Sequence, residues 1–263
     1  MLELYDAHIS PCAQKVRIVL CEKSLQWKGH QLDLQAGDQF KEEYKHLNPN
    51  SVVPTLVHDD VIFIESTVIN EYLDETFPAV PLKPQSLIHR ARMRHWVKRV
   101  DDGAHAAIGI LSFSTTRRHQ LRAKMTNEEL AEHLENIPNE YQRSWQREVI
   151  EAGVNAPIVT GAIRLYDKLL TDMETVLQHH EFLAGNRFSL ADATLTPYVT
   201  RLEWLSMAGL WTRRPAVTRW LAAMHSRDSY RRAITDVVDT ESIAVLRKYG
   251  GQAWSTIRAK LEG

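Results

Sequence analysis

The chain has 263 residues, a formal net charge of −1, and 25% charged against 44% hydrophobic residues. This composition is typical of folded globular proteins and excludes a disordered chain. The 32 basic residues are balanced by 33 acidic ones, which disfavours a non-specific nucleic-acid binder. No apolar run approaches the ~18 residues of a membrane span, and no signal peptide is evident. The chain has two cysteines, too few for a disulfide framework to stabilise a protein of this length. We therefore expect a cytoplasmic protein that binds neither a membrane nor nucleic acid.

The first eighty residues alternate between strand-like and helix-like segments. The apolar patterns predict strands over residues 2–5, 27–34, 55–58 and 61–64. They predict a helix opened by Pro11, then helices over 40–47 and 67–77. Ser66 is available as the cap of the last of these helices. The expected order is therefore β-α-β-α-β-β-α.

Three prolines between Phe77 and Pro84 mark the best domain boundary in the chain. We expect residues 1–80 to form one domain and residues 84–263 a second, all-helical domain. Apolar spacing in the second domain predicts long helices over 93–111 and 162–176, and a helix opened by Pro215.

Two further helix starts are explicit in the sequence. Thr126 with Glu129, and Ser189 with Asp192, have the spacing of capping boxes. Such boxes stabilise helix ends, so we expect a structural role for these four polar residues.

Four segments resemble motifs of the glutathione transferases: 10–17, 47–56, 65–73 and 189–192. In that family they are the active-site turn with the first helix, the stretch through a cis-proline, the turn that binds the γ-glutamyl group, and a buried capping box. The resemblance implies an α+β/α fold. An N-terminal thioredoxin-like βαβαββα domain would bind glutathione, and an all-α C-terminal domain would bind the second substrate.

Within the family the sequence shows two likenesses. Residues 37–40 look like the zeta class, the maleylacetoacetate isomerases. Residues 65–74, 90–101 and 126–134 resemble the bacterial β-etherases of lignin breakdown, which carry a long helical insertion. The isomerases are shorter, and the expected insertion here covers about 117–157. The etherase-like branch is therefore the better match.

Ser10 is the candidate catalytic residue. It precedes Pro11 at a helix start, where free N–H groups and the dipole favour an anion such as the glutathione thiolate. A serine there can also be a simple helix cap, and the two roles are compatible. Cys12 is a rival nucleophile that we expect to pack as a small apolar group instead. Tyr5 is a second rival, and its place within a strand favours packing.

The resemblance also assigns the other glutathione contacts. Gln39 would meet the glycine carboxylate, Val53 would offer its backbone to the cysteinyl part, and Pro54 would be cis. Glu65 and Ser66 would hold the γ-glutamyl group, and Asp101 would reach the glutathione amine in a partner subunit. Each of these residues could instead have a purely structural role, such as a place in a solvated loop for Gln39.

The chain departs from the family pattern just before Val53. Many relatives have Lys or Gln there, whereas this chain has Asn50-Ser51-Val52. One contact to glutathione is therefore either missing or supplied from elsewhere.

The acceptor pocket is expected on the long helix and in the insertion, where aromatic side chains could clamp an aryl ring. Residues at helical spacing can equally be core. The candidates are Trp96, His105, Ile108, Ser112, Phe113, Tyr141 and Trp145.

These observations predict a glutathione transferase, with glutathione as co-substrate and a hydrophobic aromatic acceptor. The glutathione thiolate would displace an aryloxy group next to a ketone, and no metal or nucleotide is implied. A homodimer is expected from the resemblance. The alternatives are isomerisation, dehalogenation or a general conjugation of the detoxifying kind, and a non-catalytic ligand-binding role.

Overall fold

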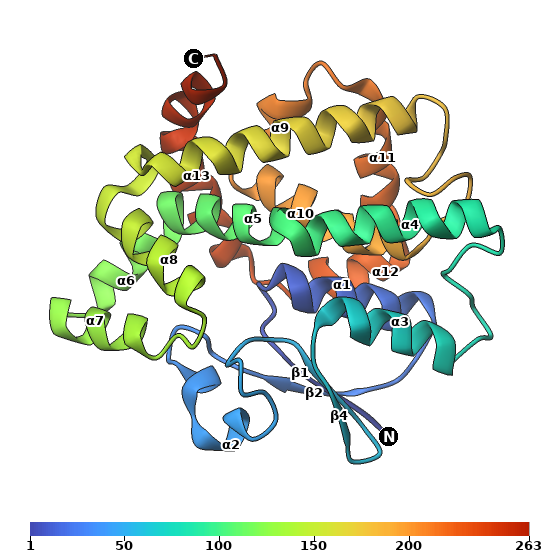
Figure 1. The fold of residues 1–263 in the computed structure, drawn as a ribbon, viewed down its shortest axis with the longest axis horizontal. Coiled ribbons are helices and arrows are strands. Elements are labelled where there is room, and N and C mark those ends of the chain that lie inside the picture. Colours follow the sequence, from blue (N-terminus) through green and yellow to red (C-terminus); the bar gives the residue numbers. More distant parts are fainter. Residues whose placement is uncertain (263) are drawn as a thin grey trace.

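The computed structural model describes residues 1–262 and begins with a four-stranded sheet (Figure 1). Its strands are β1 (Leu2–Asp6), β2 (Lys28–Gln31), β3 (Thr55–His58) and β4 (Val61–Phe63). They lie in the order β2-β1-β3-β4; β1 is parallel to β2, and β3 is antiparallel to both β1 and β4. The predicted mixed unit is therefore confirmed.

Backbone conformation explains the hairpin between β3 and β4, and the sheet order explains the exposure of β2. Asp59 and Asp60 have φ of 47° and 68°, so they form the two-residue left-handed turn that joins twisted strands. The predicted strand over 27–34 is shorter in the structure, at Lys28–Gln31. Within residues 1–262 this strand pairs with β1 alone, so it is an edge of the sheet, and most of its residues are exposed.

Three helices accompany the sheet: α1 (Pro11–Glu22), α2 (Glu42–Lys45) and α3 (Ser66–Thr76). Pro11 is the first residue of α1, as predicted, because the missing N–H costs nothing there. The prediction that Ser66 caps α3 is wrong. Glu65 occupies the cap position with φ of 65°, and Ser66 is the first helical residue. A short 3-10 helix, η1 (Asp38–Phe40), precedes α2.

The rest of the chain is helical. Its α-helices are α4 (Leu87–Arg99), α5 (His105–Ser112), α6 (Arg118–Lys124), α7 (Asn127–Glu135), α8 (Glu140–Ala152), α9 (Pro157–Leu177), α10 (Leu190–Trp204), α11 (Pro215–His225), α12 (Asp228–Tyr230) and α13 (Thr240–Glu262). Short π-helical segments lie between some of them: η2 (Val100–Ala104), η3 (Phe113–Arg117) and η6 (Arg231–Thr235). Two short 3-10 helices, η4 (Gly153–Asn155) and η5 (Ala208–Trp211), complete the helical part.

The single long helix predicted over 93–111 is interrupted in the structure. The π-helical turn η2 separates α4 from α5, and Gly103 there has non-helical dihedral angles. A Cβ at Gly103 would lie 3.0 Å from the Leu165 side chain, so this glycine lets the kinked segment approach α9 closely.

Both predicted capping boxes are confirmed. Thr126 caps α7 with Glu129 on the surface, and Ser189 caps α10 with Asp192 in the interior. Asp192 is fully buried and also accepts hydrogen bonds from the Leu183 backbone N–H and from Trp220 Nε1, each at 3.0 Å.

The layers place α1 between the sheet and the helical part. Helices α1 and α3 lie over one face of the sheet, and α10 and α4 lie above them (Figure 1). One continuous apolar core joins the two parts. Among the described residues, no helix is long and apolar enough to cross a membrane.

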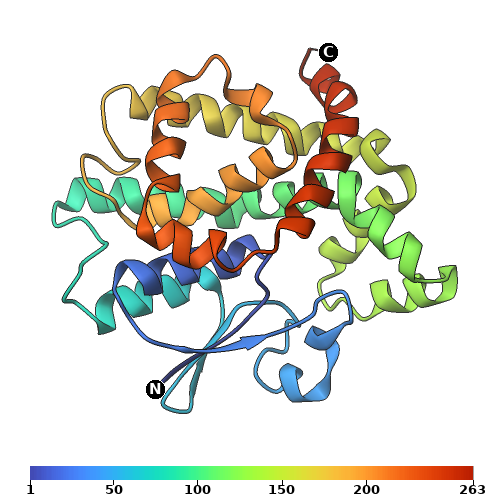
Figure 2. The same cartoon turned by 180° about the vertical axis from the view of Figure 1, so that it is seen from behind.

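Helices α6, α7 and α8, which fall in the predicted insertion, stand to one side beside the segment that carries α2, as the front and back views agree (Figures 1 and 2). They have a small core of their own. Its buried members are Leu121, Leu130, Leu134, Ile137 and Ile150, and Phe40 from the N-terminal part packs against it. The domain limits drawn from the sequence stay predictions.

Replacement of the buried cap acceptor gives a stability test. Asp192→Ala leaves several buried donors without a partner, so we expect a loss of about 3 kcal/mol or more in the free energy of unfolding. Glu129→Ala removes the matching acceptor of the exposed box and should cost only about 1 kcal/mol. Urea unfolding measures both; equal losses would contradict the role assigned to burial.

Candidate active site

Ser10 lies at the N-terminus of α1, in the position that the sequence predicted. Its Oγ accepts a long hydrogen bond of 3.4 Å from the Ala13 N–H, so Ser10 caps the helix. Among residues 1–262 the hydroxyl hydrogen has no acceptor within hydrogen-bonding distance, and the side chain is half-buried. The cap therefore leaves the O–H free to donate to a ligand at the helix end.

Cys12 lies in the first turn of α1 and contacts two polar side chains of the helical part. Its Sγ is 3.3 Å from His105 Nδ1 on α5 and 3.4 Å from the Tyr198 hydroxyl on α10. His105 and Tyr198 are themselves 3.2 Å apart, which closes a triangle. The interpretation of Cys12 as a small apolar packing group is therefore wrong.

The electrostatics of this triangle favour a thiolate. Burial raises the pKa of the Cys12 thiol, but the charge and hydrogen bond of His105, with help from Lys15 and Tyr198, lower it to about 6. The thiolate in turn raises the pKa of His105 against the opposing effect of burial. Both shifts favour the charged form of each group, a thiolate at Cys12 and an imidazolium at His105.

The N-terminus of α3 carries the residues predicted to hold the γ-glutamyl group. Glu65 is exposed and Ser66 is buried. Nearby, the Thr67 hydroxyl accepts from Lys15 Nζ at 2.9 Å and donates to Asp101 Oδ1 at 3.0 Å. Asp101 therefore contacts the N-terminal part of its own chain, and its predicted contact across a subunit boundary stays a prediction.

The turn that precedes β3 is held rigidly. The Val53–Pro54 bond is cis, as predicted. The Val52 carbonyl accepts from the Tyr44 hydroxyl at 2.6 Å and from Asn48 Nδ2 at 2.9 Å. These side chains fix the backbone that was predicted to face the cysteinyl part of glutathione.

Gln39 lies in η1 and is only 7% exposed, so the alternative of a solvated loop is wrong. Its Nε2 makes a long contact of 3.5 Å with the Leu34 carbonyl. Its Oε1 is buried and has no hydrogen-bond partner among the residues that the structure describes. Such an atom is typical of a site that awaits a ligand or a water molecule.

Most of the predicted acceptor residues belong to the core. Trp96, Ile108 and Trp145 are buried in the main apolar cluster, and Phe113 packs edge-on against Trp145 with ring centroids 5.4 Å apart. Tyr141 is 62% exposed and faces solvent. Helical periodicity cannot separate a pocket wall from a packing face, since both are apolar stripes.

His105 and Ser112 are the exceptions among these candidates. His105 contacts Cys12, and Ser112 Oγ lies 3.4 Å from Arg201 Nη1 on α10. Arg201 also donates to the Ile9 carbonyl, one residue before Ser10. These polar groups lie beside the N-terminus of α1.

Sequence reasoning missed Arg201. It is buried, forms no ion pair within the described chain, and burial lowers its pKa to about 10 against the opposing effect of Tyr166 and Tyr198. The available signal was the spacing of Tyr198 and Arg201 by three residues, which places both on one face of an otherwise apolar helix.

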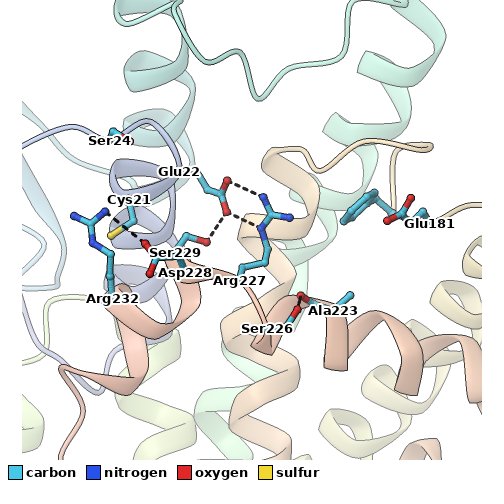
Figure 3. A pocket seen from close by; sticks show the side chains of 11 residues that line it. Cys21, Glu22, Ser24, Glu181, Ala223, Ser226, Arg227, Asp228, Ser229 and Arg232 are labelled. Atoms are coloured by element: carbon cyan, nitrogen blue, oxygen red, sulfur yellow. Dashed lines mark hydrogen bonds and ion pairs between the residues drawn. The ribbon is translucent and has the colours of Figure 1, made fainter.

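One cavity of the molecule lies away from these residues. It has a volume of about 510 Å³ and opens between the end of α1 and helices α11 and α12 (Figure 3). Within it, Arg227 donates to Glu22 at 2.7 and 2.8 Å, and Ser229 also donates to Glu22. No residue predicted to act on glutathione lines it, so we do not place the active site there.

Comparisons with known proteins identify both parts of the chain. The model described as "Glutathione S-transferase, N-terminal domain" matches residues 4–81, and "Glutathione S-transferase, C-terminal domain" matches residues 138–223. Protein LigF of Sphingobium sp. (strain NBRC 103272 / SYK-6) is 30% identical over 195 residues, which are 73% of this chain and 75% of that one.

Two other comparisons extend this result. The crystal structure of the β-etherase LigF from strain SYK-6 superposes with a TM-score of 0.80 at 26% identity, covering 88% of this chain and 98% of that one. The maleylacetoacetate isomerase of Mus musculus is 29% identical over 204 residues, 76% of this chain and 77% of that one. Both likenesses noted in the sequence are thus represented among the relatives.

The thiolate–imidazolium pair can be titrated by alkylation. We expect the rate of iodoacetamide labelling of Cys12, followed by peptide mass spectrometry, to rise with pH around a midpoint near 6. His105→Ala should move that midpoint upward, towards the ordinary thiol value of about 8.5.

Cys21 supplies an internal control for this experiment, because burial raises the pKa of its thiol. It should label slowly and only at higher pH. A Cys12 midpoint above 8, or one that His105→Ala leaves in place, would contradict the pairing.

Proposed function

The chain belongs to the glutathione transferase family, and from this premise we propose that it uses glutathione to cleave a β-aryl ether next to a ketone. The observation that carries the proposal is the likeness to the β-etherase LigF in both sequence and fold. The helices of the insertion, which include the Thr126–Leu134 segment noted in the sequence, also support it. The acceptor is a small aromatic molecule, and the setting is the catabolism of lignin-derived compounds in the cytoplasm.

In the proposed reaction the glutathione thiolate attacks the carbon that bears the aryloxy group. A C–S bond forms, the C–O bond breaks, and the electron pair leaves with the phenolate, which then takes a proton from water. The neighbouring ketone activates the carbon. No redox change occurs, and direct displacement inverts the attacked carbon.

Ser10 and the N-terminus of α1 would favour the thiolate. The helix end offers partial positive charge, and the free Ser10 hydroxyl can donate one hydrogen bond to sulfur. Lowering a thiol pKa by about two units raises its thiolate fraction at pH 7 roughly 25-fold, while lower nucleophilicity removes roughly 8-fold. Positioning of the acceptor beside sulfur must therefore supply most of the rate.

The other contacts follow the assignment made from the sequence. Gln39 would face the glycyl end, the Val53 backbone beside Pro54 the cysteinyl part, and Glu65 with Ser66 the γ-glutamyl end. The free helix end at Ser66 and the weak 3.5 Å contact of the Gln39 Nε2 donor support this arrangement, since a carboxylate needs N–H donors.

An isomerase of the maleylacetoacetate type is the second candidate. The Gly37–Phe40 segment and the mouse maleylacetoacetate isomerase relative favour it. The two reactions share the glutathione site and differ in the acceptor, so only turnover separates them.

A panel of acceptors tests the function. We expect release of phenol from an aryl ether ketone, with little turnover of maleylacetone or a chloronitroaromatic compound. Turnover of maleylacetone alone would favour the isomerase, turnover of the nitroaromatic alone a general conjugation, and glutathione binding without turnover a ligand-binding role.

Ser10→Ala tests how the thiol is activated. Loss of a hydrogen bond to a charged sulfur should raise the pKa of bound glutathione by about one to two units, followed by the ultraviolet absorbance of the thiolate. By the same arithmetic, kcat/KM should fall only about 3-fold, because lower nucleophilicity had offset most of the gain in thiolate. Thr126→Ala removes a helix cap far from this site and should leave both quantities unchanged. If Ser10→Ala behaves like Thr126→Ala, Ser10 is a cap alone.

We also propose a homodimer in which the groove between α3 and α4 faces the partner. Thr67, Glu71, Arg94, His95 and Asp101 are among its lining residues. Light scattering should give twice the chain mass, and Arg94→Glu should shift the protein towards monomer. A wild-type monomer at working concentrations would contradict the proposal and remove the role of Asp101 in a partner site.

A further inference from the structure

Arg117 and Gln39 reach the same backbone carbonyl from opposite parts of the molecule. Arg117 is the last residue of η3, and its Nη2 lies 3.4 Å from the Leu34 carbonyl. Gln39 Nε2 lies 3.5 Å from the same oxygen. One acceptor therefore brings a guanidinium from the helical part beside the amide that was assigned to the glycyl end of glutathione.

The packing of the insertion fixes this meeting point. Phe40, next to Gln39, packs against the small core of the insertion and lies edge-on to His133 of α7, with ring centroids 5.6 Å apart. Lys124 at the end of α6 donates to Gln35 Oε1 at 2.8 Å. The insertion therefore holds the loop from Leu34 to Phe40, and Arg117 sits at their junction.

Arg117 lacks an anionic partner within residues 1–262. Its guanidinium has five N–H donors, yet its contacts are two weak ones of 3.4 Å, to the Leu34 carbonyl and to Gln120 Oε1. Burial lowers its pKa to about 10, and Asp33 only partly opposes this. A half-buried cation without an ion pair is costly unless something else neutralises it.

The neighbouring charges leave this cation available. Asp33 Oδ1 accepts from the backbone N–H groups of Gln35 and Ala36, and Asp38 pairs with Lys41 at 2.7 Å. His133 has its pKa lowered by burial and by Arg117, so it is neutral at pH 7. The local balance therefore suits a bound carboxylate.

We propose that Arg117 binds the glycine carboxylate of glutathione together with Gln39, so that the insertion recognises the co-substrate as well as framing the acceptor side. This inference rests on the proposed use of glutathione. It would supply from elsewhere the glutathione contact for which Asn50-Ser51-Val52 offers no Lys or Gln. A planar guanidinium can hold both carboxylate oxygens at once, which makes it selective for that group.

The proposal can be tested without an acceptor substrate by measuring the binding of two ligands to each of several variants. Calorimetric titration would compare glutathione with its glycyl monoethyl ester, which keeps the thiol and γ-glutamyl group but lacks the glycine charge. Arg117→Met should weaken glutathione binding about 10–100-fold and leave ester binding nearly unchanged. Arg117→Lys should retain part of the affinity for glutathione, because lysine keeps the positive charge but cannot donate to both carboxylate oxygens from a planar group.

Arg118→Met is the matched control. Arg118 is adjacent, but its guanidinium donates to the Ile150 and Glu151 carbonyls within the insertion at 3.3 and 3.2 Å. Its replacement should lower thermal stability without separating the two ligands.

Three outcomes would overturn the inference. If Arg117→Met weakens both ligands equally, or if neither ligand is affected, Arg117 is structural and the proposed function stands. If the wild-type chain binds no glutathione at all, the proposed function fails and this inference fails with it.

Discussion

Helix α1 is held between the sheet and α10, and the candidate site depends on that packing. From this one helix, Ser10 presents its hydroxyl at the N-terminus and Cys12 touches His105 and Tyr198. Arg17, on the same helix, is buried against Asp6 and donates to the Ala233 carbonyl at 2.9 Å. A helix pinned at so many points keeps its N-terminus fixed, which is what an anion site built from backbone dipoles needs.

Recognition of an anionic co-substrate fits a chain of nearly zero net charge because the relevant charges are local. Arg201 is buried and Arg117 is half-buried, and neither forms an ion pair within residues 1–262. Burial strengthens the field of such a cation, since water screens it less. The proposed site therefore needs only a few cationic groups to bind an anion, whereas a solvent-exposed patch would need many.

The insertion contacts a different part of the molecule from the one that we expected from the extra length of the chain. Its size indicated a role in choosing the acceptor, yet its core packs on Phe40 and its first residues reach Leu34. Trp145, a candidate for the acceptor pocket, is part of the apolar core. The same helices can still border the acceptor, but their observed contacts are with the loop predicted to bind glutathione.

Most of the secondary structure could be predicted from local features of the sequence. Pro11 at a helix start, the two strands that flank the Asp59–Asp60 turn and both capping boxes appear where the sequence predicted them. Each of these features depends on neighbours within a few residues. The errors have local causes as well. Glu65 takes the cap position in place of Ser66, and Gly103 divides a helix whose apolar spacing runs on without a break.

The sequence by itself determined the family, the order of elements and the residues that resemble a glutathione site. Only the tertiary structure decided which polar groups meet across the two parts of the chain. Cys12 is 93 residues from His105 and 186 from Tyr198, and Arg117 is 83 residues from Leu34. Periodicity and capping report on neighbours within a turn or a strand. Contacts over such separations arise from how α1, α5, α10 and the insertion pack, which no local pattern encodes.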